Sequence, residues 1–182
     1  KLGASCDWDR TAFTMDPQYY RDVLGMFVDL YKKDKLYRGL RMVNWDPEAK
    51  TVLSNEEVIY SEENSQLYYI HYRQENGADG VVIATQRPET IFADVAVAVH
   101  PEDPRYAHLV GKNVVVPLIN RPVPVIADDY VDREFGTGAL KITPAHDQND
   151  YEIGTRYNLP VIDILTDDGR INEVCEYAPL VG

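Results

Sequence analysis

Three short stretches hold most of the side chains that could do chemistry, and each lies beside a run of apolar residues. They are residues 84–90 (ATQRPET), 134–143 (EFGTGALKIT) and 144–150 (PAHDQND). Such residues could line a polar pocket, but Gly, Pro, Asn and Asp are also the ordinary residues of surface turns.

Asp147 and Asp150 are separated by three positions at the predicted start of a helix. Asp147 could simply cap the helix, and Asp150 could interact with the helix dipole from the first turn. Alternatively, two carboxylates one turn apart can converge on a cation such as an α-ammonium group. The pattern alone leaves both interpretations open.

Lys141 and Thr143 lie two residues apart in a predicted strand, so both side chains lie on one face and Leu140 and Ile142 on the other. The polar face meets either solvent or a pocket. Arg87 follows another predicted strand and could be a solvated turn charge. The Gly136-Thr137-Gly138 triplet is read as a tight turn, because the GxxxxGK[ST] phosphate-binding pattern is absent.

Metal and covalent chemistry are both disfavoured. His146 lies beside the two aspartates, but His100 and His108 are not at ligand spacing from it. Cys6 and Cys175 form no CxxC motif, and a GxSxG motif is absent. We therefore expect no metal site, and a reducing compartment.

The elements that must position these groups change in kind along the chain. Apolar residues at steps of three and four predict a helix over residues 17–34, ended by a solvated run of lysines. From residue 61 onward, short strands alternate with turns, and one late helix is expected from 146 or 147 to about 158. The predicted strands are 67–73, 80–85, 95–99, 113–116, 123–127, 139–143 and 161–165. We predict a mixed α/β fold that is mainly β: a closed or nearly closed β-barrel with short peripheral helices, preceded by a helical connector. A mixed α+β sandwich is the alternative.

The composition describes a globular chain of 182 residues with a net charge of −12. Residues 1–60 carry 9 basic and 10 acidic side chains, whereas residues 61–182 carry 9 and 20. We expect a connector over 1–60 and a separate domain over 61–182. The apolar runs are too short to cross a bilayer, and the acidity argues against a broad basic face for nucleic acid. The start Lys1-Leu2-Gly3 suggests a piece of a longer polypeptide.

Three long strings taken together resemble one family. GTGALKITPAHDQNDYEIG, ATQRPETIFADVAVAVHPED and LGASCDWDRTAFTMD are similar to the connective-peptide region of the valyl-tRNA synthetases, which are class I aminoacyl-tRNA synthetases, and this region includes their editing domain. The resemblance covers essentially the whole chain. It implies a β-barrel editing domain that hydrolyses mischarged threonyl-tRNA(Val). Such a site is needed because an apolar valine pocket rejects threonine by only about 10²-fold.

The resemblance also assigns roles to individual residues. It implies that Asp150 binds the substrate α-ammonium, and that Arg87 and Thr90 orient the terminal adenosine or the attacking water. Lys141, Thr143 and Asp147 would bind the threonine γ-hydroxyl, and Phe135 would form a pocket wall. No general base is evident, so water positioning and carbonyl polarisation are expected instead.

The catalytic signatures of the full-length enzyme are absent from this chain. We therefore expect no cofactor for editing, with ATP and magnesium needed only by the full-length enzyme. The expected partners are the acceptor end of tRNA(Val) carrying threonine and the remainder of the synthetase. We expect a monomeric fragment in the cytoplasm, without membrane contact. Three alternatives stay open: an isoleucyl- or leucyl-type editing domain, a non-catalytic module that docks the acceptor end, and a metal hydrolase using His146.

Overall fold

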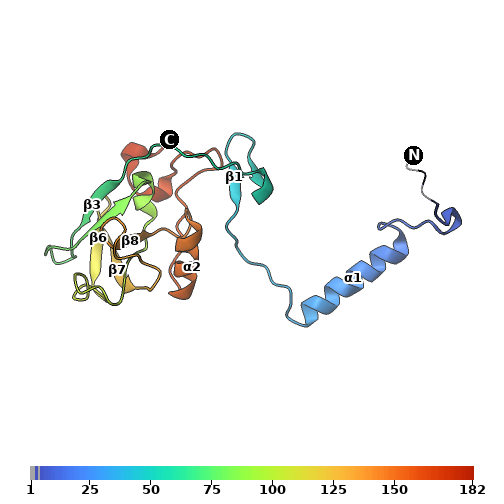
Figure 1. Cartoon of the computed structure of the whole chain (residues 1–182), viewed down its shortest axis with the longest axis horizontal. Coiled ribbons are helices and arrows are strands. Elements are labelled where there is room, and N and C mark those ends of the chain that lie inside the picture. Colours follow the sequence, from blue (N-terminus) through green and yellow to red (C-terminus); the bar gives the residue numbers. More distant parts are fainter. Residues whose placement is uncertain (1–2, 4) are drawn as a thin grey trace. The chain divides into compact units, whose positions relative to one another are not determined.

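The structure is a computed structural model that describes residue 3 and residues 5–182. Residues 1, 2 and 4, two of which belong to the LGASCDWDRTAFTMD string, lie outside the described residues. The chain divides into two compact units, one ending at Arg41 and the other comprising Met42–Gly182 (Figure 1). The connector predicted over 1–60 and the domain predicted over 61–182 stay predictions, although the second unit already begins at Met42.

The first unit contains the predicted helix. A short 3-10 helix, η1 (Trp8–Arg10), precedes α1 (Pro17–Lys32). Asp16 occupies the N-cap position of α1, but its carboxylate accepts the amide of Phe13 at 2.9 Å instead of an amide of the helix. At the other end, Lys33 pairs with Asp29 at 2.6 Å on an exposed surface, as expected for a solvated helix end. Within the described part of α1, no residue is buried.

The second unit contains three small sheets. β1 (Asn44–Asp46) pairs with β2 (Thr51–Leu53), and β3 (Tyr68–Tyr72) pairs with β4 (Val81–Thr85), both antiparallel. The largest sheet has the order β6-β7-β5-β8. Its strands are β5 (Ala96–Val99), β6 (Asn113–Val116), β7 (Arg121–Ala127) and β8 (Ala139–Ile142).

β5 is the central element of this unit. It runs parallel to β7 and antiparallel to β8, and all four of its residues are buried. Val97 and Val99 pack toward the β3–β4 hairpin, in a core that includes Tyr72 and Ile83. The opposite face packs Ala96 and Ala98 against a second core, to which Ile142 and the helix residue Ile153 belong. A strand covered on both faces explains the continuous apolar sequence AVAV.

The expected mixed fold, mainly β with few helices, is confirmed, but a closed barrel is not. A single bridge between Gln74 and Val114 connects the β3–β4 hairpin to β6. At the other side β4 lies beside β8, yet these two strands share no ladder. The hydrogen-bonded circuit is therefore open between β4 and β8 in the part of the chain that the structure describes.

The strand predicted at residues 161–165 is wrong. Only Leu165 forms a bridge, with Ile171. The Asn172 amide instead donates to the carbonyl oxygens of Asp163 and Leu165, both at 3.2 Å. A side chain thus takes the backbone groups that a neighbouring strand would have paired, and Ile164 still reaches the core.

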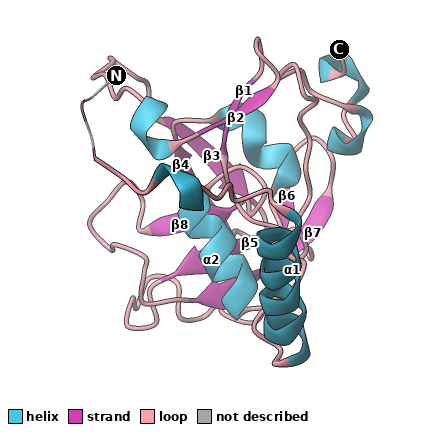
Figure 2. Ribbon diagram, turned by 90° about the vertical axis from the view of Figure 1, so that its right-hand side faces the viewer, coloured by secondary structure: helices cyan, strands magenta, loops and turns pink. Residues whose placement is uncertain are grey.

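Short helices surround the sheets. The late helix predicted after residue 146 is α2 (Gln148–Arg156), and it lies beside β8 (Figure 2). The 3-10 helices are η2 (Asn55–Glu57), η3 (Pro88–Ala93), η4 (Glu173–Cys175) and η5 (Ala178–Leu180). Among the described residues, no helix is long and apolar enough to cross a membrane.

Gly80 is the position where the β3–β4 hairpin tolerates no side chain. A Cβ atom there would lie 1.9 Å from the carbonyl oxygen of Tyr72, which is backbone and cannot move aside. We expect Gly80→Ala to lower the free energy of unfolding by about 2–4 kcal/mol, measured by urea denaturation. Gly25→Ala is the matched control, because a Cβ at Gly25 meets nothing within 4 Å. It should instead stabilise α1 by up to about 1 kcal/mol. Equal effects of the two substitutions would contradict the prediction.

Candidate active site

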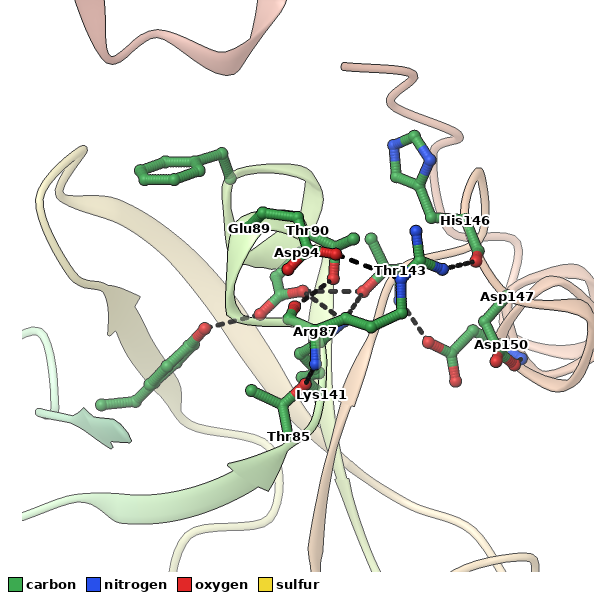
Figure 3. Close-up of polar contacts among 12 residues, drawn as sticks. Thr85, Arg87, Glu89, Thr90, Asp94, Lys141, Thr143, His146, Asp147 and Asp150 are labelled. Carbon is green, nitrogen blue, oxygen red and sulfur yellow. Dashed lines mark hydrogen bonds and ion pairs between the residues drawn. The ribbon is translucent and has the colours of Figure 1, made fainter. Parts of the chain in front are cut away.

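One pocket of about 270 Å³ brings together every residue that the sequence singled out for the site. These seven residues are Arg87, Thr90, Phe135, Lys141, Thr143, Asp147 and Asp150. They come from the segment after β4, from the loop before β8, from β8 and its end, and from the start of α2 (Figure 3). The pocket thus lies where β4 and β8 are neighbours without a ladder.

Arg87 and Thr90 are held by the turn that follows β4. β4 ends at Thr85, Pro88 opens η3, and the Thr90 hydroxyl donates to the carbonyl of Arg87 at 2.9 Å. The half-exposed Arg87 guanidinium donates to the carbonyl of His146 at 2.8 Å and to the Glu89 carboxylate at 3.2 Å. Arg87 therefore connects two sides of the pocket rather than standing free as a surface charge.

Lys141 and Thr143 share one face near the end of β8, as predicted, and both are buried. The Lys141 ammonium donates to the Thr143 hydroxyl. That hydroxyl donates in turn to Asp94 Oδ1 at 2.8 Å, and the Lys141 ammonium lies 3.5 Å from the same oxygen. The polar face of β8 is therefore the wall of a pocket and not a solvated surface.

Asp94 is the functional candidate that sequence reasoning missed. It is fully buried, and its second oxygen, Oδ2, accepts the hydroxyl of Tyr72 at 2.6 Å. Burial raises the pKa of Asp94, whereas Lys141 and the hydrogen bonds from Tyr72 and Thr143 lower it. Burial and the neighbouring carboxylate also raise the pKa of Tyr72 well above its ordinary value. The available signal was a lone carboxylate inside the apolar string IFADVAVAV.

Asp147 and Asp150 take the structural positions that their spacing suggested at the start of α2, and their convergence on a cation stays a prediction. Asp147 caps α2, with Oδ1 accepting the amides of Asn149 at 2.8 Å and Asp150 at 3.1 Å. Asp150 is buried in the first turn, and its Oδ2 accepts the amide of Thr143 at 2.9 Å. Both carboxylates also line the pocket. The cap thus fixes Asp150 against the end of β8.

The surroundings of Asp150 make its ionised form energetically unfavourable. Burial raises its pKa from 3.8 to about 6, and the nearby carboxylates of Asp147 and Asp94 add to this. The Thr143 amide and the Lys141 ammonium act in the opposite direction. A cation brought into the pocket would stabilise the ionised form.

Phe135 and Tyr130 form the aromatic part of the pocket lining. Both side chains are exposed, and Tyr130 had no signal in the sequence beyond its residue type. The glycines that follow Phe135 confirm the tight turn: φ is 59° at Gly136 and 74° at Gly138. This turn presents Phe135 at the pocket.

His146 contacts the chain beyond α2 through its ring. Its Nε2 accepts the amide of Ile164 at 3.3 Å and lies 3.9 Å from Asp163. Burial lowers the pKa of His146, and the cations Arg87 and Lys141 lower it further. Across residue 3 and residues 5–182, no group of three His, Cys, Asp or Glu side chains could hold a metal ion.

The sequence of the chain is similar to those of known proteins. A family model described as tRNA synthetases class I (I, L, M and V) matches residues 1–169. The chain belongs to this family. Its curated relatives include the valine-tRNA ligase of Phocaeicola vulgatus, 62% identical over 175 residues, which are 95% of this chain and 20% of that protein.

Two further relatives give the same picture. The valine-tRNA ligase of Bacteroides fragilis is 63% identical over 174 residues, and that of Fusobacterium nucleatum is 57% identical over 173 residues. Each alignment covers 95% of this chain and 20% of the relative. The resemblance to valyl-tRNA synthetases is thus confirmed, and the chain spans about a fifth of the length of these relatives.

A likeness to a solved structure is weaker. The LeuRS in the crystal structure of an Agrobacterium radiobacter K84 ternary complex with tRNA and LeuAMS has a TM-score of 0.42 and 23% identity. The match covers 81% of this chain and 28% of that one. At that score the likeness carries no argument about the site.

The raised pKa of Asp150 predicts how stability depends on pH. The native carboxyl binds its proton more tightly than the unfolded one, so stability should fall as pH rises from about 4 to about 6. We expect Asp150→Asn to raise the free energy of unfolding at pH 7.5 by about 1–3 kcal/mol, since one pKa unit corresponds to about 1.4 kcal/mol. At pH 4 the two proteins should differ little.

This can be measured by urea denaturation followed through the fluorescence of Trp45, in a Trp8→Phe background that removes the other tryptophan. Asp147→Asn is the control, because asparagine caps a helix as well as aspartate does and stability should stay the same. A destabilised Asp150→Asn protein at pH 7.5 would show that the buried charge is not a cost to the fold.

Proposed function

We propose that this chain is an editing domain of a valyl-tRNA synthetase, with a connector over residues 1–60 and the editing portion over 61–182. In this proposal it hydrolyses the ester bond of threonyl-tRNA(Val). The supporting observation is one pocket that places a buried carboxylate, Asp150, beside a polar wall formed by Lys141 and Thr143. No observation on the described residues favours a different function over this one.

The Asp150 carboxylate is suited to bind the α-ammonium group, which every aminoacyl ester carries. The α-ammonium would pair with Asp150, whose charge is otherwise poorly compensated in the buried first turn of α2. Opposite charges within about 4–6 Å favour both ionised forms, so binding would lower the pKa of Asp150. Asp147, which is more exposed, would help to bind the threonine γ-hydroxyl.

The Lys141–Thr143 wall suits a hydroxyl-bearing side chain. A buried ammonium and hydroxyl can both bond the threonine γ-hydroxyl, whereas a methyl group of valine would leave them unpaired. Each unpaired buried polar group costs about 1–3 kcal/mol. Such a site would therefore reject correctly charged valine and accept threonine, the reverse of the preference of an apolar valine pocket.

Hydrolysis in this site would rest on positioning. Arg87 and Thr90 would orient the terminal adenosine or the attacking water, and Phe135 would wall the entrance. No residue of the pocket is assigned as a dedicated general base, and we propose no cofactor for this reaction. ATP and magnesium would serve only the full-length enzyme, so this fragment would not attach amino acids to tRNA.

The charge of the chain bears on how the substrate is held. With 18 basic and 30 acidic side chains, the chain has few cations to neutralise phosphates. The proposed partners are the acceptor end of tRNA(Val) and the remainder of the synthetase, which would supply most of the affinity for tRNA. We propose a monomeric fragment that acts in the cytoplasm.

The direct test is single-turnover hydrolysis of threonyl-tRNA(Val) by the 182-residue chain, with valyl-tRNA(Val) as the control. We expect the threonyl ester to be cleaved at least about 100-fold faster than the valyl ester. Asp150→Asn should lower the rate by about 10²-fold or more, because the ammonium loses its counter-charge. Full activity in a folded Asp150→Asn protein would refute the assigned role.

The pH dependence provides a second test. If Asp150 must be ionised to bind the ammonium, kcat/KM for threonyl-tRNA(Val) should rise with pH through about 6 and then level off. The measurement covers pH 5 to 7, where spontaneous ester hydrolysis is slow enough to subtract. In Asp150→Asn this midpoint should be absent. A midpoint near 4 would mean that another group controls the reaction.

A third test separates this proposal from a metal hydrolase. Incubation with a chelator followed by removal of the complex should leave the hydrolysis of threonyl-tRNA(Val) unchanged within about twofold. Restoration of lost activity by added zinc or magnesium would instead support a metal-dependent reaction involving His146.

A further inference from the structure

Asp94 occupies a place in the pocket wall that the proposed roles leave unexplained. It follows η3, immediately before β5, and is fully buried. It does not line the pocket, but its polar neighbours Lys141, in β8, and Thr143, just after β8, do. Figure 3 shows Asp94 joined by dashed lines to Thr143 and Lys141, and its other oxygen accepts the Tyr72 hydroxyl.

The hydrogen bonds around Asp94 have a fixed direction. The Lys141 ammonium and the two donating hydroxyls favour the ionised form of Asp94 against the opposing effect of burial. An ionised carboxylate only accepts, so in that form the Thr143 hydroxyl donates its single proton to Oδ1. One lone pair of that hydroxyl accepts from Lys141, which leaves the other lone pair unused by these partners. The ammonium has three protons: one is given to Thr143 and one is directed toward Asp94.

This arrangement offers one acceptor and one donor to a substrate hydroxyl. We propose that Asp94 is a positioning residue for substrate selection: it orients Thr143 as an acceptor and Lys141 as a donor toward the γ-hydroxyl of a threonyl ester. The inference rests on the proposed function and deepens it. A hydroxyl can donate to one partner and accept from the other, whereas a methyl group or a hydrogen atom can do neither.

Replacement of Asp94 by asparagine would reverse this arrangement. The side-chain carbonyl of the asparagine can still accept the Tyr72 hydroxyl, but its amide would then donate to Thr143. The Thr143 proton would turn toward the pocket, which would present two donors instead of a donor and an acceptor. A substrate hydroxyl could accept from both donors, but its own proton would be left without an acceptor in the pocket, while the rest of the substrate would bind as before.

The test compares two esters of tRNA(Val) that differ only in this hydroxyl, threonyl and 2-aminobutyryl. For Asp94→Asn in the 182-residue chain we expect kcat/KM for the threonyl ester to fall about tenfold or more. For the 2-aminobutyryl ester it should stay within about threefold. A merely structural role would lower both values together, and that result would overturn the inference.

Asp103→Asn is the matched control. Asp103 is also a buried aspartate paired with a cation, Arg105, at 2.6 Å, but it lies outside the pocket. Any loss of stability in this variant should leave the ratio of the two kcat/KM values unchanged. Thermal melts of both variants accompany the kinetics, so that only folded protein is compared.

If Asp94→Asn does not fold because it leaves the Lys141 ammonium unpaired, it is tested in a background in which both of its pocket-lining neighbours are replaced, Lys141→Met with Thr143→Val. There the added Asp94→Asn change should restore stability and leave the threonyl to 2-aminobutyryl ratio within about twofold, since Asp94 acts through Lys141 and Thr143. A further change in the ratio would overturn the inference.

Two outcomes separate the inference from the function on which it rests. If the unaltered chain hydrolyses the threonyl ester but Asp94→Asn keeps the same ratio, only the inference falls. If the unaltered chain neither hydrolyses the threonyl ester nor binds its non-hydrolysable amide analogue in preference to the 2-aminobutyryl amide, the proposed function and the inference fall together.

Discussion

The buried carboxylate of Asp94 is the interaction on which the second unit depends most. Its two oxygens bond Tyr72 from β3 and Thr143 from the end of β8, which belong to different sheets. No ladder joins β4 to β8, so side chains supply the polar connection across this opening. Removing one partner from such a buried group costs more than the bond itself contributes, because the other groups stay desolvated.

The opening in the circuit of strands is also what makes room for a pocket. A ladder between β4 and β8 would fill the space beside Lys141 with backbone hydrogen bonds. Instead η3 and the cap of α2 face each other there, and the Arg87 guanidinium joins them through the carbonyl of His146. The fold thus lacks strand pairing where its polar side chains gather. The hydrogen bonds of Asp94 to Tyr72 and Thr143 compensate for part of that loss.

Local sequence patterns predicted the structural features that depend on residues close together in the chain. Helix α1, six of the seven expected strands, the cap at Asp147 and the shared face of Lys141 and Thr143 follow from spacing and turn residues. The convergence of the site residues in one pocket followed from the family resemblance, since no local rule brings residues 87 and 150 together. Their individual roles stay predictions.

The structural features that the sequence did not reveal depend on contacts between residues far apart in the chain. Asp94 bonds residues 22 and 49 positions away, so its string reads only as a carboxylate before an apolar strand. The wrong strand at 161–165 has the same cause, because Ile164 is apolar and buried but the Asn172 side chain takes the neighbouring carbonyls. Whether the strands close into a barrel is likewise decided by pairings far apart in sequence.

The β1–β2 hairpin at the start of the second unit contacts a turn that comes late in the same unit. The Trp45 indole donates to the carbonyl of Asp167 at 2.8 Å, so the beginning of the unit is tied to a point near its end. Such a contact makes the beginning and the late part of the unit depend on each other, because neither can fray without breaking it.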